Sequence, residues 1–168
     1  TAEICKLGIY LCNYQPISNL DISKDIIVLD GKYEIPEGTE FTIPSGKKVI
    51  LDYSKTKNVG FVVNGTLNLN GTVSNPIKIE DDGKYSLFTI GKNGKLIGSY
   101  VNVISSRENG KEELIKNLGE LQLSYSSFTN TKKGTNFLTS KSSKDVKIDS
   151  CTIDSWGNGI IVDGTGNF

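Results

Sequence analysis

The sequence predicts an all-β fold in which short strands coil into a solenoid, and three observations carry that prediction. Residues 143–168 contain three short runs of alternating apolar residues, separated by turns rich in Asp, Ser, Gly and Asn. Alternation places one side of each run inward, and the corners between the runs are too short for helices. The pattern recurs along the chain, and the composition, with 18 Gly and no Met, is typical of β-rich, turn-rich proteins.

The repeat has a measurable period, which defines one rung of the solenoid. The interval is 25 residues from Leu96 to Leu121 and again from Leu121 to Val146. It widens to 29 residues between Leu67 and Leu96, which indicates an insertion within residues 70–75. Insertions confined to corners are what a solenoid tolerates. In this register the last rungs share one apolar core, formed by Leu121, Leu123, Phe128, Val146, Ile148, Cys151 and Ile153.

The chain divides into a cap and a repeat region. Residues 1–25 do not follow the repeat and are expected to cover the first rung, because an end rung exposes apolar surface and unpaired backbone. Residues 26–168 are expected to form the solenoid, starting with a strand at 26–29. Two corners, Asn64-Gly65 and Asn70-Gly71, are also typical of antiparallel hairpins, but the persistent register favours pairing a full rung apart.

One segment, residues 105–119, breaks the repeat with a run of charged residues. It suits a helical turn around Leu114 and Ile115, or a solvated charged loop after which these two residues begin the next strand. Corner excursions of this kind are common places for binding walls.

The rung at residues 143–168 closely resembles the repeat of the pectate-lyase-like superfamily, and the segment VVNGTLNLNGTVSNPIKI at residues 62–79 resembles the opening rungs of many secreted bacterial and archaeal β-helix proteins. The resemblance covers nearly the whole chain and implies a right-handed parallel β-helix of about five to six rungs, in a secreted or cell-surface protein. It also implies two chemistries, calcium-dependent lyase and polygalacturonase-type hydrolase. Neither motif set is present, because the chain has no His and its one arginine is Arg107. The Asp81-Asp82 pair is interpreted as solvated turn carboxylates.

Charge and hydropathy exclude two classes of partner. Nineteen basic residues balance nineteen acidic ones without a basic stripe, which argues against nucleic-acid binding. No run of eighteen apolar residues exists, so no membrane span is expected. Cys5 and Cys12 suit either a short disulfide or two free thiols, and Cys151 occupies an inward core position.

The same register places two tyrosines together. Tyr100 and Tyr125 occupy one outward position on successive rungs, with Pro76 one rung before them and Ser150 one rung after. Because neighbouring rungs are about 4.8 Å apart, we expect the two rings to stack or lie side by side on a flat outer face.

The outward column next to the tyrosines consists of Lys78, Asn102, Ser127 and Thr152. Aromatic rings beside hydroxyls and amides suit a polysaccharide, whose sugar faces are apolar and whose edges are polar. Stacked tyrosines equally suit a purely structural cross-strand pair. Trp156, the only tryptophan, is expected either to add a second contact zone or to cover the core.

A calcium site is the one cofactor hypothesis that the sequence offers. Asp149 and Asp154 are five residues apart across a corner of the last rung, which contains the densest set of acidic residues. Calcium needs several converging oxygen ligands, whereas aspartates at corners also cap turns without any metal.

The expected function is non-catalytic binding of a polysaccharide such as cellulose by an adhesin-like surface module. The alternatives are a lyase or glycoside hydrolase whose catalytic residues lie outside this stretch, and a structural spike of a phage or spore. Because the register places partners for Val146 and Ile148 beyond Phe168, we also expect the β-helix to continue there, or another chain to cover its end.

Overall fold

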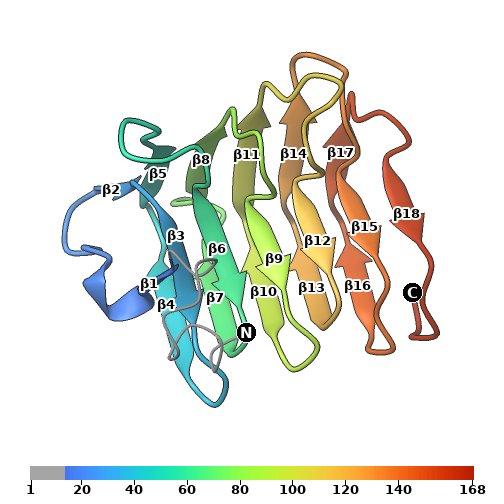
Figure 1. The fold of residues 1–168 in the computed structure, drawn as a ribbon, viewed down its shortest axis with the longest axis horizontal. Coiled ribbons are helices and arrows are strands. Elements are labelled where there is room, and N and C mark those ends of the chain that lie inside the picture. Colours follow the sequence, from blue (N-terminus) through green and yellow to red (C-terminus); the bar gives the residue numbers. More distant parts are fainter. Residues whose placement is uncertain (1–13) are drawn as a thin grey trace.

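In the computed structural model, which describes residues 14–168, the chain forms a parallel β-solenoid of about five rungs (Figure 1). These residues contain eighteen strands, and their only helical element is the 3-10 turn η1 (Ile17–Asn19). Every strand pair is parallel, so partners come from successive rungs rather than from hairpins. The all-β solenoid predicted from the sequence is confirmed.

Three sheets, named A, B and C here, form the walls of the solenoid. Sheet B contains β2 (Ile26–Leu29), β5 (Lys48–Leu51), β8 (Ile77–Asp81), β11 (Val101–Ser105), β14 (Ser127–Asn130) and β17 (Thr152–Asp154). Sheet A contains β1 (Tyr14–Pro16), β3 (Lys32–Ile35), β6 (Gly60–Val63), β9 (Phe88–Ile90), β12 (Ile115–Asn117), β15 (Leu138–Ser140) and β18 (Ile160–Val162). Sheet C contains β4 (Glu40–Pro44), β7 (Thr66–Asn70), β10 (Lys95–Ser99), β13 (Glu120–Ser124) and β16 (Val146–Asp149). From β2 onward the chain visits sheets B, A and C in that order on each rung.

The strand register agrees with the sequence repeat. Leu121 of β13 pairs with Leu96 on one side and with Val146 on the other. Leu96 pairs in turn with Leu67, so the 29-residue interval is an insertion at the corner between β7 and β8. The Asn-Gly pairs at this corner and at the one before β7 join strands of different sheets, and the hairpin alternative is therefore excluded.

Alternation along each strand builds one continuous core. On β11, Val101 and Val103 are buried, whereas Asn102 and Ile104 face outward. The core extends from η1 to the last rungs. Each fully buried aliphatic or aromatic side chain contributes roughly 1.5–3 kcal/mol, so this column is the main source of stability.

The core predicted for the last rungs is confirmed. Leu121, Leu123, Phe128 and Val146 are buried, and Ile148, Cys151 and Ile153 are half-buried against them. Phe128 also contacts Phe137, with ring centroids 4.7 Å apart. Aromatic rings from neighbouring strands thus fill the inside of the solenoid at this end.

The two kinds of corner that matter for function differ in length. A single residue, Tyr100, joins β10 of sheet C to β11 of sheet B. By contrast, the corner from sheet B to sheet A carries the loops 52–59, 82–87, 106–114 and 131–137, which line the upper edge of Figure 1. Short corners fix side chains in register, whereas long loops form walls and hollows.

The charged excursion that the sequence predicted at residues 105–119 is loop 106–114, and it contains no helical turn. Leu114 is buried and Ile115 begins β12, which agrees with the alternative that these residues begin the next strand. The interpretation as a solvated loop is wrong for Arg107, whose side chain is fully buried. The loop turns inward there because Asp81 supplies a carboxylate partner.

The expected cap is described only in part. β1 pairs in parallel with β3 at the end of sheet A, and Ile17 and Leu20 are buried against the core. Residues 1–13, with Cys5 and Cys12, lie outside the described residues.

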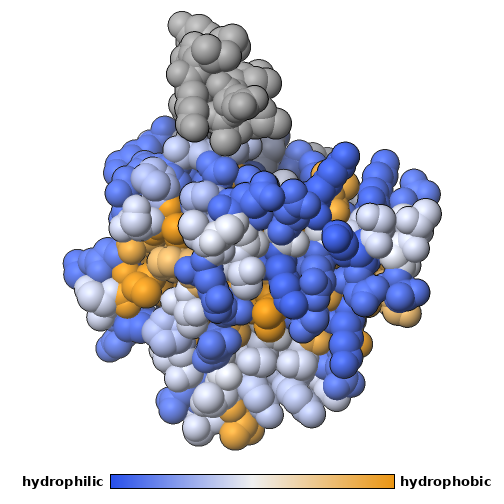
Figure 2. All heavy atoms as spheres, turned by 90° about the horizontal axis from the view of Figure 1, so that it is seen from below, coloured by the Kyte–Doolittle hydropathy of each residue, from blue (hydrophilic) through white to orange (hydrophobic). Residues whose placement is uncertain are grey.

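The outer surface, seen from below, is mostly hydrophilic, with several small hydrophobic patches (Figure 2). Within residues 14–168, no helix has the length and apolar character needed to cross a membrane.

Candidate functional site

Tyr100 and Tyr125 form the corner between sheets C and B on successive rungs. Both residues adopt the left-handed backbone conformation, with φ of 49° and 50°, and Ser150 repeats it on the next rung with φ of 54°. The backbone N–H of Tyr100 donates to the carbonyl of Ser124, and that of Tyr125 to the carbonyl of Asp149. The corner is therefore a regular ladder of bent residues.

Tyrosine is not the residue that this backbone conformation favours. Left-handed φ costs an L-residue roughly 1–2 kcal/mol, and Gly and Asn tolerate it best. The chain nevertheless places tyrosine there twice. A side chain kept against its local backbone preference points to a role for the ring itself, either in packing or in binding.

The two rings stack as the register predicted. Their centroids lie 5.2 Å apart with an interplanar angle of 12°, so each ring covers one face of the other. Tyr125 remains 54% exposed, and the next position of the ladder holds only the small side chain of Ser150. The pair lies at a corner rather than on the flat face that we expected, because the left-handed bend ends β10 and β13 there.

A ladder of polar side chains runs beside the tyrosines on the outer face of sheet B. Lys78, Asn102, Ser127 and Thr152 are strand partners in that order, as the sequence predicted. The Ser127 hydroxyl donates to the side-chain oxygen of Asn102 at 3.2 Å. Hydroxyl, amide and ammonium groups therefore line this face, and Asn102 and Ser127 each follow a tyrosine by two residues.

A hollow of about 150 Å³ lies on the other side of the tyrosine corner, on the outer face of sheet C. Its polar lining comes from Gln122, Ser124, Lys147 and Asp149. Asp149 accepts a hydrogen bond from the Ser150 hydroxyl at 3.2 Å. The two sheets that meet at the Tyr125 corner thus both carry hydrogen-bonding groups on their outer faces.

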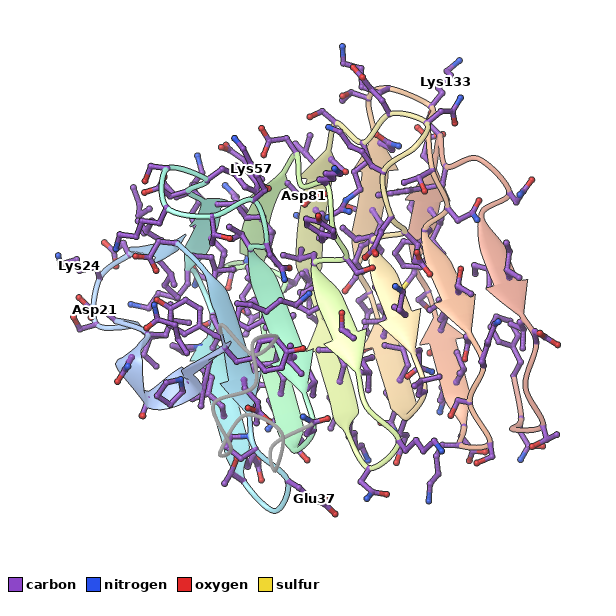
Figure 3. The ribbon with its side chains drawn as sticks, viewed as in Figure 1. Asp21, Lys24, Glu37, Lys57, Asp81 and Lys133 are labelled. Atoms are coloured by element: carbon purple, nitrogen blue, oxygen red, sulfur yellow. The ribbon has the colours of Figure 1, made fainter. Side chains whose placement is uncertain are left out.

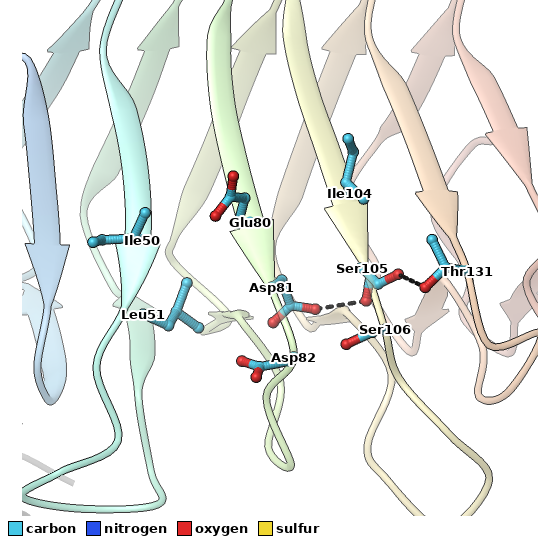
Figure 4. A pocket seen from close by; sticks show the side chains of 9 residues that line it. All are labelled: Ile50, Leu51, Glu80, Asp81, Asp82, Ile104, Ser105, Ser106 and Thr131. Atoms are coloured by element: carbon cyan, nitrogen blue, oxygen red, sulfur yellow. Dashed lines mark hydrogen bonds between the residues drawn. The ribbon is translucent and has the colours of Figure 1, made fainter.

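A larger hollow of about 370 Å³ lies at the carboxyl ends of β5, β8 and β11 in sheet B (Figure 4). It is lined by Ile50, Leu51, Glu80, Asp81, Asp82, Ile104, Ser105, Ser106 and Thr131. Ile104 is 60% exposed and gives the hollow an apolar wall. Polar groups at its edge include the Thr131 hydroxyl, which donates to the carbonyl of Ser105 at 3.1 Å.

Asp81 is held by a buried network behind this hollow. Arg107 donates to both of its carboxylate oxygens, from Nε at 2.6 Å and from Nη2 at 2.7 Å. The Ser105 hydroxyl and the Gly83 amide donate to the same oxygens. A carboxylate with both oxygens engaged in this way is a structural anchor, so the interpretation of Asp81 as a solvated turn residue is wrong.

The sequence analysis missed Arg107, although a signal existed. Arg107 is the one arginine among nineteen basic residues, and it lies two positions after Ser105, the strand partner of Asp81. Arginine suits buried carboxylates because its planar fork binds them bidentately and stays charged. A lone arginine beside a corner aspartate was therefore the feature to follow.

Trp156 lies in the core and apart from the tyrosine pair. Its indole N–H donates to the carbonyl of Phe128 at 2.9 Å, and its ring packs against Phe137 with centroids 5.7 Å apart. The side chain is 8% exposed. Of the two roles that the sequence left open, the structure shows the cover over the core.

Asp149 and Asp154 end β16 and β17 respectively, on different sheets. Among residues 14–168, no group of three or more His, Cys, Asp or Glu side chains is placed to hold a metal ion. The calcium site therefore stays a prediction from sequence.

Comparisons of the chain with protein-family models, with curated proteins and with solved structures find no match. The structure shows the parallel solenoid, and the superfamily stays a resemblance of the sequence repeat. Because one fold hosts many functions, the function must be argued from the side chains at the tyrosine corner.

Proposed function

We propose that the tyrosine corner and the adjoining face of sheet B bind a polysaccharide without cleaving it. The observation that carries this proposal is the stack of Tyr100 and Tyr125 in a backbone conformation unfavourable to tyrosine, with more than half of Tyr125 exposed. Apolar sugar faces pack on aromatic rings, and sugar hydroxyls bond to amides, hydroxyls and charged groups. Both kinds of group meet at this corner.

The arrangement suits a long glycan better than a small molecule. The binding groups repeat from rung to rung, at the strand spacing of about 4.8 Å, and they extend from the hollow on sheet C across the corner to Asn102 and Ser127. An open surface of repeating contacts gains affinity by engaging many sugar units at once. A secreted or cell-surface adhesin-like module is the biological setting that we propose.

Two of the three carboxylates at the hollow of Figure 4, those of Asp81 and Glu80 but not that of Asp82, are paired within the protein, which supports the non-catalytic form of the proposal. Both oxygens of Asp81 are occupied by buried donors, and Glu80 lies 2.7 Å from the ammonium of Lys48. A carboxylate whose two oxygens both accept hydrogen bonds within the protein, as those of Asp81 do, is not free to contact a sugar.

The test is a pull-down with a panel of insoluble polysaccharides, cellulose included, followed by assay of the released sugar. The double variant Tyr100→Asn/Tyr125→Asn removes the rings while keeping residues that accept left-handed φ. We expect the unmodified protein to bind one polysaccharide of the panel without releasing sugar, and the double variant to bind it at least about tenfold more weakly, a loss of ~1.4 kcal/mol.

Two controls separate binding from stability. Leu118→Asn removes an exposed apolar side chain at a different corner and should leave binding unchanged. Tyr100→Phe/Tyr125→Phe should keep most of the affinity because the ring stack persists. Equal binding by the Asn double variant and the unmodified protein would refute the proposal, release of unsaturated uronates would favour a lyase, and a trimer without glycan binding would favour a spike.

A further inference from the structure

A separate hollow of about 250 Å³ lies at the corner between sheets B and A, among three consecutive long loops. Lys57 belongs to loop 52–59, Lys84 to loop 82–87 and Lys111 to loop 106–114, and all three line it together with Tyr53 and Asp82. Lys57 is labelled along this upper edge in Figure 3. Asp82 also lines the hollow of Figure 4, so the two hollows adjoin.

The lining carries an excess of positive charge. Three lysines and a single aspartate, Asp82, line it, and none of the three lysines forms a salt bridge within residues 14–168. The Lys84 ammonium lies over the Tyr85 ring, 5.6 Å from its centroid. The Lys111 ammonium donates only to the backbone carbonyl of Asp82, at 3.2 Å. The nearby charge of Asp81 is already neutralised by Arg107. Three lysines from successive rungs therefore line one hollow, with one carboxylate among them and no salt bridge to any of the three.

Tyr53 supplies an independent observation. Its hydroxyl is the one buried side-chain N or O atom in residues 14–168 that lacks a hydrogen-bond partner. Burial raises the pKa of this phenol well above its usual value, and the negative charges of Asp81 and Asp82 add to the effect. The hydroxyl is thus a neutral donor at every physiological pH. The Asp82 carboxylate lies close to the hydroxyl but outside hydrogen-bond geometry. Buried donors without partners are rare, and each one calls for an explanation. This hydroxyl is closed to solvent, so a group bound in the hollow reaches it only when a neighbouring side chain moves aside.

We propose that this hollow binds an oxyanion group, a sulfate, phosphate or carboxylate, carried by the glycan. The inference rests on the proposed function, since the polymer that reaches the hollow is the one held at the tyrosine corner. The path between them crosses the outer face of sheet B and the hollow of Figure 4, and ends at Asp82. The three lysines supply charge and the Tyr53 hydroxyl supplies a directed hydrogen bond.

The experiment uses dextrans of one chain length that carry no charge, carboxymethyl, phosphate or sulfate groups, with binding measured by biolayer interferometry. We expect at least one charged dextran to bind about tenfold more tightly than the neutral polymer, with an affinity that falls as salt rises. The preferred group identifies the oxyanion. Equal binding of all four dextrans would overturn the proposal.

A matched pair of triple variants separates a site from general attraction. Lys57→Gln/Lys84→Gln/Lys111→Gln should abolish the preference for the charged polymer. Lys92→Gln/Lys141→Gln/Lys144→Gln removes the same charge from a hollow of about 490 Å³ elsewhere on the surface and should preserve the preference. Equal losses in both variants would show nonspecific attraction and would overturn the proposal.

Tyr53→Phe tests the hydrogen bond with little change in shape. If the hydroxyl binds the oxyanion, the phenylalanine variant should lose about fivefold in affinity for the preferred dextran and keep the salt dependence. Unchanged affinity with a raised melting temperature would assign the hydroxyl no ligand and would refute its role. The variant Tyr100→Asn/Tyr125→Asn should keep the charge preference, so failure at the tyrosine corner is read separately from failure at this hollow.

Discussion

Arg107 lies against Asp81 in a bidentate pair that is fully buried on both sides, with Nε 2.6 Å from Oδ2 and Nη2 2.7 Å from Oδ1. The remaining guanidinium nitrogen, Nη1, donates to the carbonyl of Glu112 at 3.0 Å. One side chain therefore joins β8 to both ends of loop 106–114. The pair organises the long corner on which the two hollows depend.

The first prediction concerns this pair. Arg107→Leu leaves the Asp81 carboxylate buried without its partner, and removing one member of a buried ion pair typically costs about 3–5 kcal/mol. Urea denaturation of the variant should show a loss of that size in the free energy of unfolding. Arg107→Lys should also destabilise, because an ammonium cannot reproduce the bidentate geometry.

A double replacement shows whether the Arg107–Asp81 pair adds to the stability of the folded protein or only fixes the conformation of loop 106–114. Asp81→Leu/Arg107→Leu removes both charges, and apolar replacement of a buried pair is often close to neutral. The double variant should therefore be more stable than Arg107→Leu alone. If Arg107→Leu unfolds at the same urea concentration as the unmodified protein, the pair has no anchoring role.

How far the sequence could predict these features depends on the strand register. The register of Leu121 with Val146 followed from the period, because apolar alternation must keep the core sides of neighbouring rungs aligned. The stack of Tyr100 on Tyr125 followed from the same period. The left-handed bend at these residues did not follow, because tyrosine gives no local signal for it.

The Arg107–Asp81 pair could not be predicted from the sequence repeat, and the reason is physical. Alternation tells which side chains of a strand face inward, and it stops where β11 ends at Ser105. Beyond that point, whether Arg107 faces solvent or folds back on Asp81 depends on the path of a nine-residue loop. The burial of Trp156 likewise depends on its reach to the carbonyl of Phe128, which the sequence does not encode as a pattern.

The second prediction concerns the core. Phe128 is 1% exposed and packs against Phe137, so Phe128→Ala should lower the free energy of unfolding by about 3–5 kcal/mol. Ile104→Ala, at an exposed position on the neighbouring strand, should change it by less than about 0.5 kcal/mol. Chemical denaturation of both variants makes the comparison, and similar small losses would contradict the assignment of Phe128 to the core.

The third prediction extends the tyrosine ladder. Ser150 has the same left-handed backbone as the two tyrosines and follows them on the next rung, so Ser150→Tyr should place a third ring on Tyr125. Stacked aromatic pairs gain about 0.5–1.5 kcal/mol, and serine at this position already bears most of the cost of positive φ. We expect stability within about 1 kcal/mol of the unmodified protein, measured by thermal melting.

The same variant bears on function. A third ring lengthens the aromatic surface, so Ser150→Tyr should bind the glycan severalfold more tightly in the pull-down assay. Ser150→Gly is the control, because it relaxes the backbone without adding a ring and should leave affinity unchanged. A tighter Gly variant would show that backbone strain, rather than ring area, governs binding.

The last prediction concerns pH and the first rung. Asp30 accepts hydrogen bonds from Lys55 and, at 2.6 Å, from the Tyr33 hydroxyl, and these donors hold the pKa of its carboxyl below the usual 3.8 although burial opposes them. Burial and this same carboxylate raise the pKa of Tyr33 to about 12. The two groups therefore bound a window of pH in which their interaction stabilises the folded chain.

The sign differs at the two ends of that window. Because the pKa of Asp30 is lowered on folding, its contribution is complete above the unfolded value of 3.8 and is lost as pH falls through the folded value. Because the pKa of Tyr33 is raised on folding, its contribution is complete below the unfolded value of 10.0 and is lost as pH rises toward about 12.

Asp30→Asn should therefore be less stable than the unmodified protein at neutral pH, and the difference in unfolding free energy should shrink as the solution is acidified below the ordinary pKa of 3.8. The unmodified protein should lose stability as pH rises from 10.0, the unfolded pKa of Tyr33, toward about 12, its folded pKa. Tyr33→Phe should lose less stability over the same range. Urea denaturation across the pH range measures both effects. A stability difference between Asp30→Asn and the unmodified protein that is independent of pH would show that the Asp30 carboxylate gains nothing from Tyr33 and Lys55.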